Sequence, residues 1–176
     1  MITRKSPFEL ERMRKASELT RLILGRVAAA VKPGVTTQEL DKLAEAAAKE
    51  FGVKPAFKGY QGFPASICTS VNEQVVHGIP GPRKLKTGDI VGLDFGIVYK
   101  GYYGDAAVTV GVGEIAPEHQ RLLEVTREAL WKGISAARAG NRLSAVSRAI
   151  QEHVESNGFS VGRDFVGHGI GQTMHE

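Results

Sequence analysis

The sequence predicts a mixed fold of helices and strands, of the α/β (α+β) class, in a single domain. Its 176 residues correspond to about one domain of ~150 residues, and 42% hydrophobic with 24% charged residues is ordinary for a globular protein. Four segments have the apolar periodicity of helices, whereas a central stretch alternates like a strand hairpin. The order of helices and glycines in the first half also recurs in the second.

The first two helices are expected to begin at capping boxes. Residues 6–9 (Ser-Pro-Phe-Glu) form the first, with proline in the first helical position, and the Lys-Pro-Gly at residues 32–34 ends that helix. Residues 36–39 (Thr-Thr-Gln-Glu) form the second, and the helix that follows is expected to end at Gly52.

The middle of the chain is expected to consist of a loop and strands. Residues 55–64 are rich in glycine and aromatic side chains and predict a loop, while residues 66–70 and 74–77 have the character of extended segments. Residues 89–98 and 102–112 predict two β-branched strands joined by a short turn.

The second half predicts two more helices, at residues 117–138 and from Leu143 to the stop at residues 157–158. Residues 159–170 are expected to contain a strand that ends in a glycine cluster. Both halves have a pair of glycines 18 residues apart, and an offset of 106 relates the two pairs, Gly34 with Gly52 and Gly140 with Gly158.

This offset favours an internal duplication over a chance likeness of two helical hairpins. The first half continues beyond Gly52 as far as Gly113, whereas only 18 residues follow Gly158. The second half is therefore expected to be incomplete.

An aspartate pair is the strongest candidate for a chemical site. Asp94 lies between Gly92 and Gly96 on the face of its strand opposite the apolar residues. A hairpin turn at residues 99–100 would pair Asp94 directly with Asp105, and a turn one residue later would make them diagonal neighbours. Either register places the two carboxylates on one face, ~4.5–8 Å apart, beside a hollow that the glycines leave.

Two like charges on a partly buried face repel each other strongly. A shared proton, a nearby cation or full exposure to solvent would each relieve the repulsion. We favour a divalent cation, because apolar residues and glycines flank both aspartates. The alternative is a pair of exposed aspartates near a turn.

Histidines add possible nitrogen ligands. His168 lies between two glycines, His175 follows seven residues later, and His77 precedes Gly78. Each histidine taken alone is more often structural than functional, and it is their combination with the aspartate pair that favours a site. The single cysteine, Cys68, excludes an internal disulfide and a thiolate cluster. Carboxylates with imidazole suit Mn, Fe, Co or Zn in a hydrolytic site.

Four motifs resemble the type I methionine aminopeptidases in their bacterial form. They are the stretches at residues 70–80, 88–94, 101–105 and 167–171, and their order and spacing match that family across essentially the whole chain. The resemblance implies the pita-bread metallopeptidase fold, whose two halves are related by a pseudo-twofold axis.

The resemblance also implies a role for each candidate residue. Asp94 resembles the bidentate ligand of one metal ion, Asp105 the carboxylate that bridges two ions, and His168 the imidazole ligand of the other ion. His77 and His175 resemble two catalytic histidines around the scissile peptide that do not bind metal. Three residues resemble the walls of the pocket for the methionine side chain, namely Tyr60, Phe63 and Cys68.

The implied function is removal of the initiator methionine from nascent polypeptides by a hydroxide bound to two divalent metal ions, with Co, Mn, Fe or Zn as candidates. Two alternatives remain: a proline-specific peptidase of the same fold, and an inactive pita-bread module that binds protein or RNA.

The family completes its site with two C-terminal glutamates, and Glu176 does not match either position. The 176-residue chain is therefore expected to carry three of the five protein ligands and to be inactive alone.

Charge and hydropathy bear on location and partners. Residues 1–60 hold 12 Lys and Arg against 7 Asp and Glu, whereas the remainder has a net charge of −1. We favour a solvated helix surface as the explanation of this positive charge, and a transient contact with ribosomal RNA is the alternative. No apolar run approaches the ~20 residues of a membrane span, so we expect a cytoplasmic protein without membrane or DNA partners.

Overall fold

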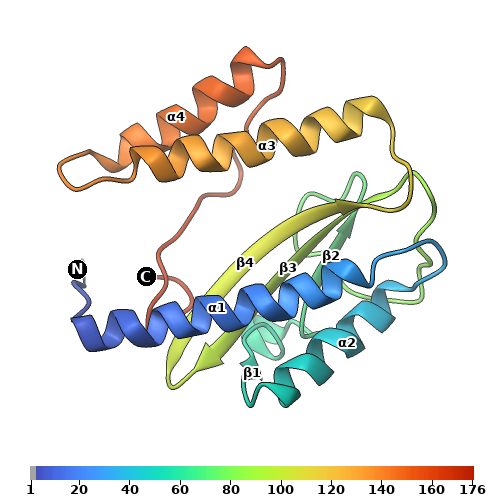
Figure 1. Cartoon of the computed structure of the whole chain (residues 1–176), viewed down its shortest axis with the longest axis horizontal. Coiled ribbons are helices and arrows are strands. Elements are labelled where there is room, and N and C mark those ends of the chain that lie inside the picture. Colours follow the sequence, from blue (N-terminus) through green and yellow to red (C-terminus); the bar gives the residue numbers. More distant parts are fainter. Residues whose placement is uncertain (1–2) are drawn as a thin grey trace. The chain divides into compact units, whose positions relative to one another are not determined.

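The computed structural model describes residues 3–176 and divides into two compact units (Figure 1). The first unit comprises the chain up to Ile115 and the returning segment His168–Glu176. The second unit comprises Ala116–Gly167. That both units belong to one catalytic domain stays a prediction.

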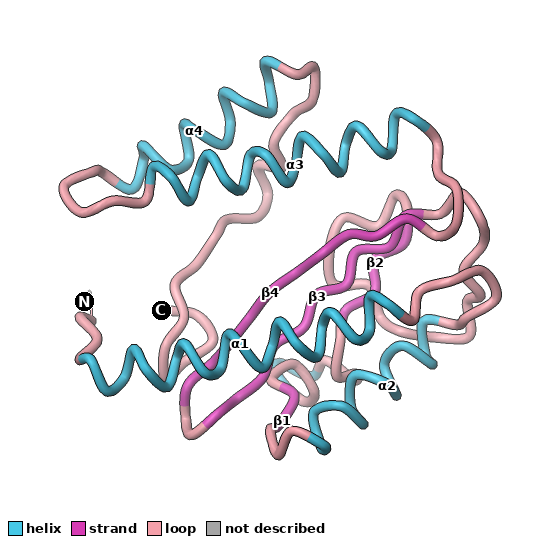
Figure 2. The backbone as a smooth tube through the Cα atoms, viewed as in Figure 1, coloured by secondary structure: helices cyan, strands magenta, loops and turns pink. Residues whose placement is uncertain are grey.

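The first unit is built on a four-stranded antiparallel sheet with β3 (Ile90–Tyr99) at its centre. β4 (Tyr102–Gly111) pairs with β3 along its whole length. The short strands β1 (Lys54–Pro55) and β2 (Cys68–Val71) share the other edge of β3, β1 near its end and β2 near its start. Figure 2 shows these strands in magenta, beside the two helices of the unit.

Helices α1 (Pro7–Ala29) and α2 (Thr37–Glu50) begin as expected at capping boxes. Ser6 and Glu9 satisfy each other's exposed backbone N–H groups at the start of α1, and the Thr36–Glu39 stretch does the same for α2. α1 lies against β3 and β4 and also contacts α2. Both helix predictions are confirmed.

One face of β3 forms the centre of the core. Its four alternating apolar side chains are fully buried against α1 and α2: Val91, Leu93, Phe95 and Ile97. Gly104, on the same face of β4, allows α1 to approach, since a Cβ there would lie 2.6 Å from the Ala16 carbonyl carbon. The remaining face of β3 is thereby left for the site.

The second unit is a helical hairpin of α3 (Pro117–Ala136) and α4 (Leu143–Ser156). α4 begins and ends 106 residues after α2, which is the offset that the glycines predict. Gly34 and Gly140 have φ values of 90° and 91°, and both lie in the left-handed region that favours glycine. The structure thus has a helix and a glycine turn repeated at the expected offset, and the duplication of the two halves stays a prediction.

Two expected strands are absent from the described residues. Residues 74–77 follow a turn at Asn72 (φ 56°), and His77 itself has a φ of 58°, so this stretch curves into a loop. Residues 159–170 have no strand partner among the described residues, and Val166 is 89% exposed. Alternating apolar residues form a strand only where their backbone pairs with a sheet edge, and neither stretch makes such a pairing among the described residues.

None of the described helices combines the length and the apolar character that crossing a bilayer requires.

Candidate metal centre and substrate pocket

The β3–β4 register places the two aspartates diagonally on one face of the sheet. Asp94 lies opposite Ala107, and Asp105 lies opposite Gly96. Lys100 (φ 48°) and Gly101 (φ 82°) make the turn between the strands, as the second of the two expected registers requires. The prediction of a shared face is confirmed.

The expected hollow beside the aspartates is only partly present. A Cβ at position 96 would lie 2.8 Å from Cε1 of Phe57, so the space beside Gly96 is already filled by that ring. A Cβ at Gly92 would meet nothing closer than 3.6 Å. Gly96 therefore serves the packing of Phe57, which the sequence pattern did not predict.

Burial favours the protonated form of both aspartates. Burial, followed by the charge and hydrogen bond of Asp105, raises the pKa of Asp94 to about 7. Burial also raises the pKa of Asp105, and the nearby His168 opposes that change. A divalent cation beside these carboxylates would compensate the cost of burying their charged forms, so the donor set suits a metal ion.

Two histidines lie beside the pair. His168 Nε2 is 3.8 Å from Asp105 Oδ2, and the rings of His168 and His175 have centroids 4.3 Å apart. Nδ1 of His175 is 2.9 Å from the hydroxyl of Tyr60. Asp94, Asp105, His168, His175 and Tyr60 thus form one continuous chain of neighbours.

These neighbours do not yet form a closed ligand cage. Among residues 3–176, no group of three or more His, Cys, Asp or Glu side chains is arranged to hold a metal ion. The chemistry of the donors therefore fits a metal, whereas ligand assignments rest on the residue types and on the resemblance.

The three expected pocket residues share one apolar cluster. Cys68 is buried, and Tyr60 and Phe63 pack half-buried against the same cluster. Cys68 lies opposite Asp94 in the β2–β3 register, so this cluster adjoins the aspartate pair. Two members were missed by sequence reasoning because their positions carry no local signal, namely Phe57 and Met174.

Cys68 is a poor nucleophile in this setting. Burial raises the pKa of its thiol to about 12, with a further contribution from the negative charges of Asp94 and Asp105. Since the thiolate is the reactive form, the thiol stays inert at neutral pH. An apolar wall is the role that this environment supports.

His77 lies on the loop that follows β2. Gly78 holds this loop against the strand, because Thr69 donates its N–H to the Gly78 carbonyl (2.8 Å) and Gly78 donates its own N–H to the Ser70 hydroxyl (3.1 Å). A Cβ at position 78 would lie 2.3 Å from the Thr69 carbonyl oxygen, so only glycine permits this approach. The loop is thereby fixed beside the strand that carries Cys68.

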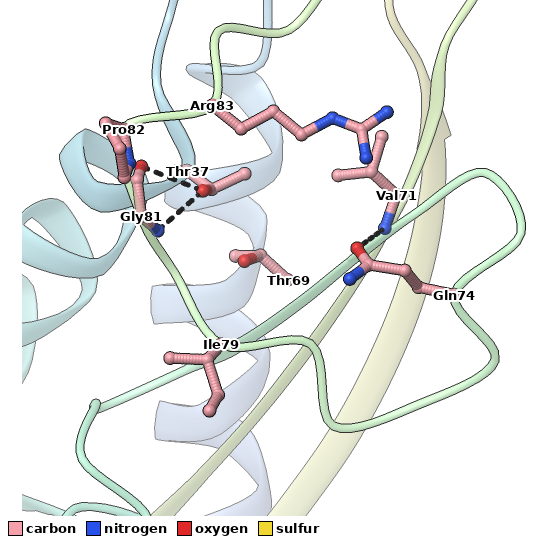
Figure 3. A pocket seen from close by; sticks show the side chains of 8 residues that line it. All are labelled: Thr37, Thr69, Val71, Gln74, Ile79, Gly81, Pro82 and Arg83. Carbon is pink, nitrogen blue, oxygen red and sulfur yellow. Dashed lines mark hydrogen bonds between the residues drawn. The ribbon is translucent and has the colours of Figure 1, made fainter.

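A separate cavity of about 540 Å³ lies on the opposite face of β2 (Figure 3). Thr69 and Val71, which face the core side of the strand, line it together with the start of α2 and residues 79–83. The Thr69 hydroxyl is buried and has no hydrogen-bond partner among the described residues. This cavity is distinct from the aspartate pair.

Comparison with known proteins bears on both fold and site. The model of metallopeptidase family M24 matches residues 11–176. The methionine aminopeptidase of Clostridium acetobutylicum is 52% identical over 177 residues, an alignment that covers 100% of this chain and 71% of the relative. Methionine aminopeptidase 1 of Bacillus subtilis is 51% identical over 176 residues, with the same coverage.

Solved structures agree with the sequence matches. The methionine aminopeptidase of Rickettsia prowazekii superposes with a TM-score of 0.98 at 40% identity, covering 100% of this chain and 71% of that one. The X-Pro aminopeptidase of Thermotoga maritima has a TM-score of 0.80 at 23% identity, over 98% of this chain and 48% of that one, and shows the fold alone. The expected pita-bread fold is confirmed.

Proposed function

The chain belongs to metallopeptidase family M24, and on that premise we propose that it is a methionine aminopeptidase. The observation that carries the proposal is the diagonal Asp94–Asp105 pair with His168 beside it. The family uses divalent metal ions, and these donors are of the type that such ions prefer. The substrate is a peptide whose first residue is methionine, including the start of a nascent chain.

We further propose that Asp94, Asp105 and His168 hold two divalent ions, with Co, Mn, Fe and Zn as candidates. The raised pKa of Asp94 supports this assignment, because a cation would restore the charged carboxylate that burial disfavours. When bound, the ions supply a Lewis acid that polarises the first peptide carbonyl and lowers the pKa of water.

The chain's own residues orient the substrate. Tyr60, Phe63 and Cys68 support an apolar pocket for the methionine side chain, and a buried thiol is compatible with a thioether neighbour. The Tyr60 hydroxyl holds the ring of His175, which in this proposal contacts the scissile peptide from one side. His77 contacts the same peptide from its loop beside β2.

The alternatives receive less support. The proline-specific relatives share about 23% identity, against about 50% for the methionine enzymes. A non-catalytic module would have no need for a buried carboxylate pair beside two histidines, since such a pair destabilises the folded chain unless a cation or protons neutralise it.

Peptide hydrolysis tests the proposal directly. The chain is supplied with Co²⁺ or Mn²⁺ and tested on Met-Ala-Ser and Ala-Pro-Ser. Release of free methionine from Met-Ala-Ser alone would support the proposal, and it would overturn the expectation that three of the five family ligands leave the chain inactive. Asp105→Asn should lower kcat/KM by roughly 10³-fold, which corresponds to about 4 kcal/mol of lost transition-state stabilisation. Cleavage of Ala-Pro-Ser alone would establish the proline-specific alternative, and metal binding without cleavage of either peptide would support the non-catalytic one.

The pocket assignment has its own test. Cys68→Phe should raise KM for Met-Ala-Ser, because the larger ring would fill the space that the thioether needs. Phe8→Leu is a matched control, since Phe8 is exposed on α1 and lies outside this cluster. An unchanged KM in Cys68→Phe would remove Cys68 from the pocket wall.

We also propose a transient contact with ribosomal RNA. Four basic residues, Arg12, Arg14, Lys15 and Lys100, line a hollow of about 500 Å³ together with Phe8 and Tyr99. Two carboxylates, Glu11 and Glu18, line it as well, so its side chains keep an excess of positive charge. Basic side chains beside aromatic rings suit a polyanion with stackable bases. Co-sedimentation with ribosomes should occur at low salt and disappear at high salt, and absence of binding at low salt would refute the contact.

A further inference from the structure

The segment His168–Glu176 carries two candidate site histidines but contains no helix or strand. Its position must therefore come from contacts with the rest of the first unit. One contact is made by the backbone: Tyr103, at the free edge of β4, donates its N–H to the Gly171 carbonyl at 2.8 Å. The segment thus crosses the edge of the strand that carries Asp105.

A second contact is made by side chains on the helix side of that edge. Gln172 donates from Nε2 to the hydroxyl of Tyr102 at 2.8 Å. The same hydroxyl donates to Oε1 of Glu9 at 2.9 Å. Tyr102 is 4% exposed, so the hydroxyl is held in a well-packed place between the segment and α1.

The direction of these two bonds is determined by Glu9. Hydrogen bonds from the backbone and hydroxyl of Ser6, and from Tyr102, lower the pKa of Glu9, so it is a carboxylate that only accepts. The Tyr102 proton therefore points to Glu9, and the oxygen is left to accept from Gln172. The amide of Gln172 consequently has one favourable orientation.

Gln172 lies between the two histidines, four residues after His168 and three residues before His175. Two other contacts hold the same segment: Gly171 accepts a hydrogen bond from Tyr103, and Glu176 forms an ion pair with Lys5. Among these contacts, the one made by Gln172 lies between the two residues that carry the imidazoles.

We propose that Tyr102 is a positioning residue, whose hydroxyl joins Glu9 to Gln172 and thereby sets where His168 and His175 lie relative to Asp105. The effect on peptide hydrolysis rests on the proposed function, whereas the placement of the two histidines by Tyr102 does not depend on it. The capping box of α1 is then part of the support of the site, because Glu9 serves both.

Removing the hydroxyl alone tests the proposal. Tyr102→Phe retains the ring and leaves Gln172 without its acceptor. In the metal-free protein, the side-chain ¹H–¹⁵N resonances of His168 and His175 should shift and broaden. Affinity for Co²⁺ should fall by about 10–100-fold, as for other groups that orient a ligand through a second residue. Hydrolysis of Met-Ala-Ser should lose kcat, with KM changed little.

Tyr99→Phe is the matched control. Tyr99 lies directly opposite Tyr102 in the β3–β4 register, on the other side of the same turn. The Tyr99→Phe variant should have the same histidine resonances and the same Co²⁺ affinity as the unchanged chain. Gln172→Leu provides a second variant at an exposed position, so it should fold even if Tyr102→Phe does not.

Gln172→Leu should reproduce the histidine shifts of Tyr102→Phe, and the double variant should be no worse than either single one. Histidine resonances unchanged in Gln172→Leu, or additive losses in the double variant, would overturn the positioning role. Because the resonances are measured without metal or substrate, they test the positioning role separately from the proposed function, which peptide hydrolysis tests.

Discussion

The two faces of β3 are built from the same ten residues but by opposite rules. The face toward α1 holds Val91, Leu93, Phe95 and Ile97, all fully buried in the core. The other face holds Asp94 between Gly92 and Gly96. One face gains stability from apolar burial, whereas the other places a carboxylate where solvent cannot fully screen it.

This difference separates the source of stability from the source of chemistry within a single strand. The core face holds the backbone in register, and the register alone makes Asp94 and Asp105 diagonal neighbours. The carboxylate face lowers the stability of the metal-free chain, because burial favours the protonated form of Asp94. Changes on the two faces should therefore have effects of different kinds.

The largest change in stability is expected on the core face. Phe95→Ala should lower the free energy of unfolding by about 3–5 kcal/mol, because the ring is fully buried and its removal leaves a cavity. Urea denaturation followed by far-ultraviolet circular dichroism measures this loss. A loss below about 1 kcal/mol would contradict the assignment of this face to the core.

On the other face, Asp94 should make the metal-free protein less stable as pH rises. Its pKa is raised to about 7 in the folded chain from 3.8. The stabilisation that this shift gives to the folded state is therefore fully present below about pH 4 and is lost as pH rises through 7. In Asp94→Asn, the free energy of unfolding should change less between pH 4 and 8 than in the unchanged chain, by no more than about 4 kcal/mol. Melting temperatures from pH 4 to 8 provide the measurement, and an unchanged profile would count against the buried carboxylate.

A smaller effect distinguishes the two glycines beside Asp94. Gly96→Ala should cost about 1–3 kcal/mol, because the added methyl would press on Phe57. Gly92→Ala is the matched control on the same face, where the methyl meets only ordinary contacts. Equal unfolding midpoints for the two variants would show that Phe57 moves aside freely.

Local features of the fold could be predicted, because their causes lie within a few residues. The capping box at Ser6 and Glu9 and the stop at Gly34 are signals of this kind. The pairing rules of a hairpin left two possible registers, both of which place the two aspartates on one face. In the structure Lys100 and Gly101 form the turn, and the register is the one in which the aspartates are diagonal.

Features that depend on distant parts of the chain could not be predicted. The strand expected within residues 159–170 is absent. The prediction was wrong because apolar alternation does not show whether a distant strand will pair with the segment. Tyr102 was missed as a support of the site, since its partners lie 93 and 70 residues away in the sequence. Met174 carries no pattern that would place it beside Cys68.

The most direct test of the central claim is a calorimetric titration of the metal-free chain with Co²⁺ near pH 7. We expect saturable binding with proton release, because Asp94 must lose its proton to bind, together with a visible absorption band of the bound ion. Asp94→Asn, Asp105→Asn and His168→Ala should each weaken binding severely, while Phe95→Leu on the opposite face should not. Binding of unchanged affinity in the three site variants would contradict a metal centre on this face of β3.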